Sequence, residues 1–171
     1  ARFSDFLEQR LETAGVCGQV RRYKPCEHNL LWGEIVGSDA EGNLRVAAEI
    51  LPGEPILALC PLNRIGLHER STGRFQVGQR RAFHLRRVEA MERNGIARVQ
   101  VVLDRVAKTL VETLLNEQLG TEADRIRFHC LKRFVGHRSL VVTDRRLPKA
   151  AILSVDHELR ERVEVRILRQ P

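Results

Sequence analysis

The cysteines and histidines have the most obvious potential for chemistry, because thiolates and imidazoles are common nucleophiles, bases and zinc ligands. The four cysteines form no Cys-x-x-Cys pair. Cys17 and Cys26 lie nine residues apart with His28 two further on, a poor spacing for a zinc site. His129 and Cys130 are adjacent, so on a strand they would point to opposite faces and could not form a base–nucleophile pair. The sequence therefore predicts no catalytic site, no bound metal and no cofactor.

Basic side chains are the other candidates for function, and they are unevenly distributed. The net charge is +7, and 25 of the 29 basic residues are arginines, whose planar guanidinium suits phosphate groups. Residues 105–171 carry 14 basic and 9 acidic side chains, so +5 of the excess lies there. This favours a nucleic-acid partner, held through its phosphates and by stacking of bases on aromatic rings. A solvated surface that binds nothing is the simpler alternative.

The alternation of residue types places many of these side chains on predicted strands. In 125–135 apolar and basic residues alternate, which predicts a strand with Cys130 and Phe134 toward the core and a basic face opposite. Tyr23, which follows two arginines, is the best candidate for stacking on a base. The residues expected to contact RNA are Arg21, Arg22, Tyr23, His68, His84, Arg86, Arg125, Arg127, His129, Arg133, Arg138, Arg145, Arg146 and Lys149.

The first part of the chain is expected to form the elements that position the candidate RNA contacts at residues 21–23, 68, 84 and 86. Residues 1–14 predict an amphipathic helix with its phenylalanines and leucines on one side. Residues 15–104 predict five or six short strands, the first over 16–23, separated by turns rich in glycine and proline. Short strands at this spacing are typical of a small barrel of the OB type and not of a two-sheet sandwich.

The hydrophobic period changes in 97–120, where alternation gives way to apolar residues at every fourth position. A strand ending near Asp104 is thus expected to lead directly into a helix that Gly120 ends. Residues 105–171 then predict the order helix, strand, strand, helix, strand. The predicted fold class is α+β, in three parts: a helix over 1–14, a barrel over 15–104 and an αββαβ module over 105–171.

This order resembles the S1–KH core of the NusA family of bacterial transcription factors. Four segments are similar to motifs of that family. Segment 101–117 resembles its joint between strand and helix, and segment 75–80 resembles the entry to one of its barrel strands. Segment 134–142 resembles its Gly-x-Arg hairpin, and segment 158–165 resembles the strand that begins with Glu-Leu and closes its KH units. The similarity covers about residues 30–168. It implies a KH-like module that holds single-stranded RNA, with RNA polymerase or the ribosome as candidate protein partners.

One feature of KH domains is missing. They approach the sugar-phosphate backbone with a Gly-x-x-Gly loop, but no glycine occurs between Thr143 and Ser154. Two hypotheses follow. The first is a non-catalytic RNA-binding accessory protein of the transcription or translation machinery. The second is a protein-interaction module on a degenerate S1–KH scaffold, which docks on polymerase, the ribosome or another complex.

The sequence also predicts where the protein resides. It has no apolar run approaching the roughly 20 residues that span a bilayer, and its start lacks the apolar region of a signal peptide. We therefore expect a cytoplasmic protein that does not enter the membrane, with reduced cysteines.

Overall fold

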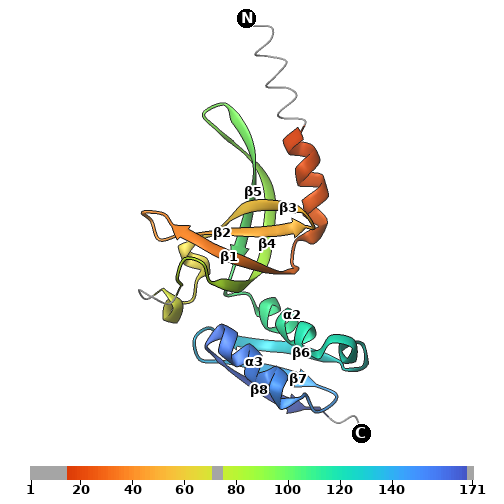
Figure 1. The fold of residues 1–171 in the computed structure, drawn as a ribbon. Helices are drawn as coiled ribbons and strands as arrows, with labels where there is room; N and C mark the ends of the chain where they lie inside the picture. Colours follow the sequence, from red (N-terminus) through yellow and green to blue (C-terminus); the bar gives the residue numbers. More distant parts are fainter. Residues whose placement is uncertain (1–14, 71–74, 169–171) are drawn as a thin grey trace, which may run out of the picture.

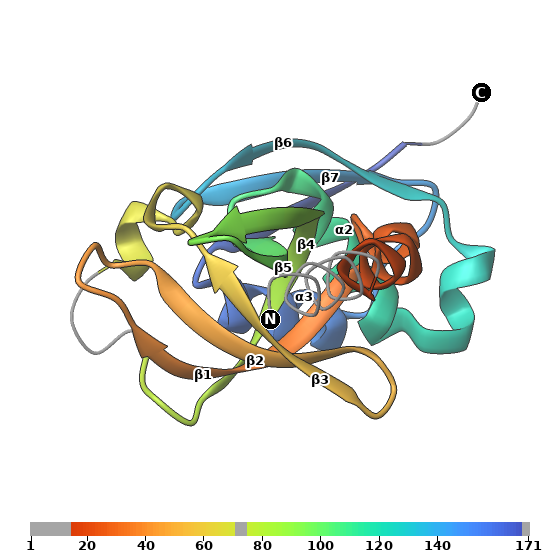
Figure 2. The same ribbon diagram turned by 90° about the horizontal axis from the view of Figure 1, so that it is seen from above.

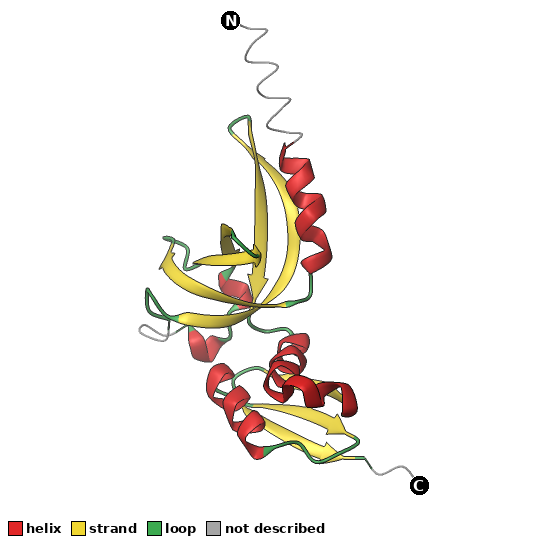
Figure 3. Cartoon of the chain, turned by 45° about the vertical axis from the view of Figure 1, so that its right-hand side comes forward, coloured by secondary structure: helices red, strands yellow, loops and turns green. Residues whose placement is uncertain are grey.

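The computed structural model describes residues 15–70 and 75–168, which form a β-barrel and a smaller layer of helices on a sheet (Figure 1). The predicted helix over 1–14 lies outside the described residues. The chain combines helices with a largely antiparallel barrel and a separate small sheet, as in the α+β class (Figure 3).

Five strands close the barrel in the order β1-β2-β3-β5-β4, which is consistent with the predicted OB/S1-like barrel. All neighbours pair antiparallel except β3 and β5, which are parallel. The strands are β1 (Leu30–Ser38), β2 (Leu44–Leu51), β3 (Glu54–Cys60), β4 (Arg80–Arg93) and β5 (Ile96–Asp104), and the short 3-10 turns are η1 (Lys24–Cys26), η2 (Leu62–Arg64) and η3 (Leu67–Glu69).

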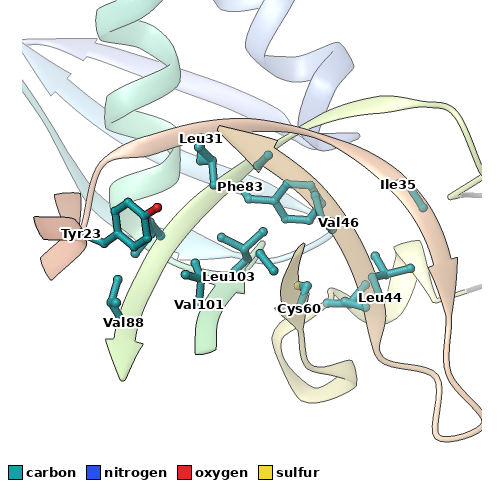
Figure 4. Close-up of a cluster of buried hydrophobic side chains, with 14 residues drawn as sticks. Tyr23, Leu31, Ile35, Leu44, Val46, Cys60, Phe83, Val88, Val101 and Leu103 are labelled. Atoms are coloured by element: carbon teal, nitrogen blue, oxygen red, sulfur yellow. The ribbon is translucent and has the colours of Figure 1, made fainter. Parts of the chain in front are cut away.

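Alternation along strands such as β2 builds the barrel core. On β2, for example, Leu44, Val46 and Ala48 are buried and the residues between them are more exposed. Figure 4 shows Leu44 and Val46 in the same core as Phe83 and Leu103. All four residues and Ala48 belong to one hydrophobic cluster. Burial of this continuous apolar surface stabilises the barrel.

The segment predicted as the first strand is a helix: residues 15–23 are helical. Val16, Val20 and Tyr23 recur at the helical spacing and pack toward the barrel, with Tyr23 only 2% exposed. A segment this short fits both the two-residue and the four-residue period, and contact with the barrel decides between them.

The second module has the predicted order of helix, strand, strand, helix, strand. Its sheet has the order β6-β7-β8, with β7 and β8 parallel. Gly120 ends the first helix with φ of 58°, a backbone conformation that favours glycine. The elements are α2 (Lys108–Leu119), η4 (Gly120–Arg125), β6 (Phe128–Phe134), β7 (Arg138–Thr143), α3 (Lys149–Leu159) and β8 (Arg162–Ile167).

Strand β6 contains a β-bulge that changes which side chains face the core. Its pairing with β7 shifts register between Cys130 and Lys132, so Leu131 is an extra residue. A bulge reverses the inward–outward alternation for the rest of the strand. The prediction of Phe134 inside and Arg133 outside was therefore wrong: Phe134 is 50% exposed, whereas the Arg133 side chain is 2% exposed.

A buried ionic cluster joins the barrel to the second module. Arg105 follows β5 and is fully buried. Its guanidinium donates to Glu69 of η3 (Nη2 to Oε2, 2.6 Å), to Glu158 of α3 (Nη1 to Oε1, 2.7 Å) and to the Ala82 carbonyl of β4 (2.8 Å). One side chain thus contacts three segments that are distant in sequence.

Strand β4 also contributes to both hydrophobic cores. Phe83 and Leu85 belong to the barrel cluster, whereas Ala82 belongs to the cluster of the second module. Trp32 of β1 packs against that second cluster, and its indole N–H lies 3.0 Å from both carboxylate oxygens of Glu117 on α2. The barrel wall is therefore part of the packing surface for α2.

Candidate nucleic-acid interface

One face of the β6-β7-β8 sheet is covered by helices and the other is open. Both α2 and α3 lie on the inner side, while β6 and β7 run along the edge of the molecule in Figure 2. Cys130, Val141 and Val163 point inward and are buried. We call the outward side chains the open sheet face: Lys132, Phe134, Arg138, Leu140, Val142, Arg162, Glu164 and Arg166.

Positive charge dominates the open sheet face. Lys132, Arg138, Arg162 and Arg166 are all exposed. Among the described residues of this face, Glu164 is the single carboxylate, and its Oε2 lies 3.6 Å from Arg138 Nη1. An exposed sheet with this excess of cations can accept an anionic chain laid across it.

An aromatic ring stands at the end of this face, beside the β6–β7 turn. Phe134 is 50% exposed, and the guanidinium carbon of Arg138 lies 5.9 Å from its ring centroid. The two residues are paired across the strands, and Arg162 is the neighbour of Arg138 on the next strand. A hollow of about 590 Å³, which we call the Phe134 pocket, is lined by Phe134, Gly136, His137, Arg138, Arg162 and Glu164.

The barrel helps to fix the turn that shapes this pocket. Gly136 has φ of 83°, and a Cβ placed there would come within 2.9 Å of His68 Nδ1, so glycine permits both the turn and the close approach. His68 Nε2 lies 3.0 Å from the Leu159 carbonyl of α3. His68, predicted to contact RNA, is therefore half-buried in the joint between the modules.

Arg133, another predicted RNA contact, is a buried structural residue. Its guanidinium pairs with Glu161 at 2.7 Å (Nη2 to Oε1) and donates to the Ala107 carbonyl at 2.8 Å. Glu161 is also buried and accepts the backbone N–H of Gly136 at 3.0 Å. This pair supports the β6–β7 turn from the inner side, and its charge does not reach solvent.

Two of the predicted RNA contacts on the barrel are also buried. The Tyr23 ring lies in the barrel core (Figure 4), and its hydroxyl donates to Glu54 Oε2 at 3.0 Å. His84 is 5% exposed, with Nε2 3.3 Å from Nδ1 of His28. Neither ring is available to stack on a base, because both side chains are buried.

The other predicted contacts lie on the surface in separate groups. Arg21 and Arg22 are exposed on the N-terminal helix, where Arg22 pairs with Glu54. Arg86 is half-buried at the register shift of β4. His129 lies at the free edge of β6, with Nδ1 2.7 Å from Glu112 Oε1. Arg21, Arg22 and Arg86 lie away from the open sheet face, whereas His129 is paired with Val142 of that face but has its imidazole held at the sheet edge by Glu112.

A second basic group gathers at the end of the sheet opposite the Phe134 pocket. The backbone N–H of Arg127 donates to the Asp144 carboxylate (Oδ1, 3.0 Å) and the backbone N–H of Asp144 donates to the Arg127 carbonyl (3.0 Å), which brings the start of β6 beside the loop after β7. Lys149 is exposed at the start of α3. Of the predicted residues only Arg138 lies on the open sheet face, while this end holds the exposed Arg125, Arg127, Arg145 and Arg146.

Among the charged and aromatic members of the open sheet face, sequence reasoning missed Lys132, Phe134, Arg162, Glu164 and Arg166. Phe134 was assigned to the core because nothing in the sequence marks the bulge at Leu131. Arg162 and Arg166 could have been found from the alternation of β8, whose valines point inward. Lys132 faces outward because of the same bulge.

Over residues 15–70 and 75–168, no three His, Cys, Asp or Glu side chains come together to hold a metal ion. No helix in that part of the chain has the length and apolar character needed to cross a membrane.

Comparisons with known proteins do not identify a family. No protein-family model matches the chain, and no curated protein matches it. Among solved structures, it is similar to a chain in the crystal structure of an a/eIF2alpha–aDim2p–rRNA complex from Pyrococcus horikoshii OT3, with a TM-score of 0.32 and 18% identity over 58% of this chain and 67% of that chain. A likeness at this level does not bear on function, and the resemblance to the NusA family stays a prediction.

Proposed function

We propose that this protein binds single-stranded RNA on its open sheet face, as a non-catalytic cytoplasmic accessory of the transcription or translation machinery. The observation that carries the proposal is the composition of that face, where four exposed cations accompany one carboxylate and an exposed aromatic ring. Phosphate neutralisation and stacking are the two contributions by which single strands are held without strong sequence preference.

The charge on the face sets the expected salt dependence. If Lys132, Arg138, Arg162 and Arg166 each neutralise one phosphate, counterion release from a single strand gives a slope of log K against log salt of about −3. The six residues of β8 rise roughly 20 Å along the strand. The face is therefore long enough for a few nucleotides in a row.

The loop where a KH domain would hold RNA offers less support. Between β7 and α3 the loop has no glycine. It is closed by its own hydrogen bonds, from Thr143 Oγ1 to the Arg145 carbonyl (2.9 Å) and from Arg145 N to Thr143 Oγ1 (3.3 Å). A backbone with this geometry and side chains at every position cannot approach a sugar-phosphate chain as closely as glycines do.

The test is the affinity of labelled ten-nucleotide RNAs by fluorescence anisotropy at 50 and 200 mM salt. Arg162→Glu/Arg166→Glu on the open face is compared with Arg93→Glu/Arg98→Glu, two exposed residues of the β4–β5 hairpin. We expect the first variant to bind at least tenfold more weakly than the second, although both change the net charge equally. The proposal fails if RNA is not bound at 50 mM salt, if binding does not weaken as salt rises, or if the two variants behave alike.

Protein docking is the second candidate, favoured by one observation. Leu131 and Ile167 are 46% and 47% exposed on β6 and β8, and exposed apolar side chains of this kind mark many protein contacts. A pull-down with and without nuclease separates the candidates. Partners such as polymerase or ribosomal proteins that remain after nuclease treatment favour docking, whereas partners that disappear favour RNA.

A further inference from the structure

We propose that the Phe134 pocket receives one unpaired base and, through Glu164, prefers a base that carries an exocyclic amino group. This inference rests on the proposed function and specifies the RNA that the site would take. The pocket combines a ring for stacking, two guanidinium groups for phosphate and one carboxylate that can accept a hydrogen bond.

The aromatic ring faces solvent because of a specific backbone feature. The bulge at Leu131 turns Phe134 outward, and without it the ring would point into the core of the second module. Phe134 therefore exposes half of its surface at the end of a strand whose position is fixed by pairing with β7 and by the joint with the barrel. An exposed ring on a rigid element is a suitable stacking surface for a base.

The cations are arranged in a row beside this ring. Phe134, Arg138 and Arg162 are direct neighbours on β6, β7 and β8, so their Cα atoms are separated by roughly 5 Å per strand. A base stacked on Phe134 would leave its phosphate near the guanidinium groups of Arg138 and Arg162. The pocket volume of about 590 Å³ lies within the ordinary range for small-ligand sites.

Glu164 gives the pocket a means of discrimination. It lines the pocket, and its ion pair with Arg138 at 3.6 Å is long, so a carboxylate oxygen is left to accept another hydrogen bond. A carboxylate accepts from the amino group of cytosine, adenine or guanine. Uracil has no amino group and presents a carbonyl oxygen in its place, which a carboxylate repels.

Base pairing should weaken binding at this site. In a duplex the base is stacked between its neighbours and its pairing edge is occupied, so it must be extruded before it can lie on Phe134, which costs free energy. The expected order of affinity is therefore an unpaired cytosine strand, then an unpaired uracil strand, then a duplex of equal length. Cytosine and uracil are matched in ring size and differ along one edge, where cytosine has an amino group and an N3 acceptor and uracil has a carbonyl oxygen and an N3 proton.

The experiment measures binding of ten-nucleotide oligo(C), ten-nucleotide oligo(U) and a ten-base-pair RNA duplex to the full chain at low salt. The variants are Phe134→Leu, which keeps an apolar side chain without the ring, Glu164→Gln, and Leu153→Ala as an exposed apolar control on α3. We expect Phe134→Leu to weaken oligo(C) binding roughly tenfold and Leu153→Ala to change it little. Glu164→Gln should reduce the ratio of oligo(C) to oligo(U) affinity, whatever it does to each affinity.

The outcomes separate this inference from the proposed function. If RNA binds in a salt-dependent way but Phe134→Leu binds as the wild type does, the base site is wrong and the proposed function stands. If Glu164→Gln leaves the oligo(C) to oligo(U) ratio unchanged, the amino-group preference is wrong. If the wild type binds none of the RNAs, the proposed function fails and the base site fails with it.

Discussion

The guanidinium of Arg105 and the carboxylate of Glu69 lie 2.6 Å apart, and both side chains are buried. The same guanidinium contacts Glu158, whose other oxygen lies 3.3 Å from Arg81. Two arginines therefore face two glutamates across the joint between the barrel and α3. Buried charges of this kind are tolerated only while every member keeps its partners.

The first prediction concerns the loss of Arg105. Arg105→Met should lower the free energy of unfolding by about 3–5 kcal/mol, because Glu69 and Glu158 would remain buried without their shared partner. Urea denaturation followed by circular dichroism measures this. Arg87→Met is the matched control, since the pair of Arg87 with Glu89 is half-exposed and should contribute little. Equal stability losses in the two variants would contradict a structural role for the buried cluster.

The second prediction is that the barrel and the second module unfold together. Trp32 is the single tryptophan of the chain and packs from β1 against α2. Its fluorescence therefore reports on the contact between the barrel and the second module. Because the ionic cluster and β4 link both cores, fluorescence and far-ultraviolet circular dichroism should give the same urea midpoint. Two separate midpoints would show that the modules are energetically independent.

The third prediction distinguishes Arg133 from the basic residues beside it. Arg133→Met should destabilise the protein by about 3–5 kcal/mol, because Glu161 is buried and would lose its charged partner. Lys132→Met, an exposed neighbour on the same strand, should leave stability nearly unchanged and weaken RNA binding instead. The assignment is wrong if Arg133→Met is as stable as the wild type.

These arginines illustrate what the sequence could and could not predict. The hydrophobic period correctly predicted the order of elements in the second module, because each strand and helix there is long enough to define its own period. It could not predict the bulge, since Leu131 is flanked by ordinary strand residues with no glycine or proline. Because of that one bulged residue, Arg133 faces the core and Phe134 faces solvent, the reverse of the prediction.

Tertiary partners were also beyond the sequence pattern. Arg105 lies 36 residues from Glu69 and 53 from Glu158, and no local rule links positions so far apart. Tyr23 was predicted to be an exposed stacking ring because it follows two arginines. On a helix, however, it shares a face with Val16 and Val20, which contact the barrel.

The fourth prediction is a dependence of stability on pH that arises from His84. Burial lowers the pKa of His84 from its ordinary value of 6.5, and the neighbouring His28 acts in the same direction, while Asp104 opposes them. The unfolded chain therefore binds a proton more readily than the folded one, so stability is greatest above about pH 6.5 and decreases as the pH falls below that value.

Urea unfolding at pH 7.5 and 5.5 tests this dependence. His84→Gln should show a smaller difference in unfolding free energy between the two pH values than the wild type does. His157→Gln, at an exposed position on α3, should keep the full difference. If His84→Gln retains it as well, the acid sensitivity arises from other groups.

Strand β4 has a consequence for how this chain can vary. Strand β4 presents Phe83 to one core and Ala82 to the other. The barrel and the second module therefore cannot be separated and exchanged independently. A barrel grafted onto a different second module would leave Ala82 and Trp32 without their apolar neighbours and Arg105 without Glu158. The two halves therefore depend on each other for stability, whereas the cations of the open sheet face belong to neither core.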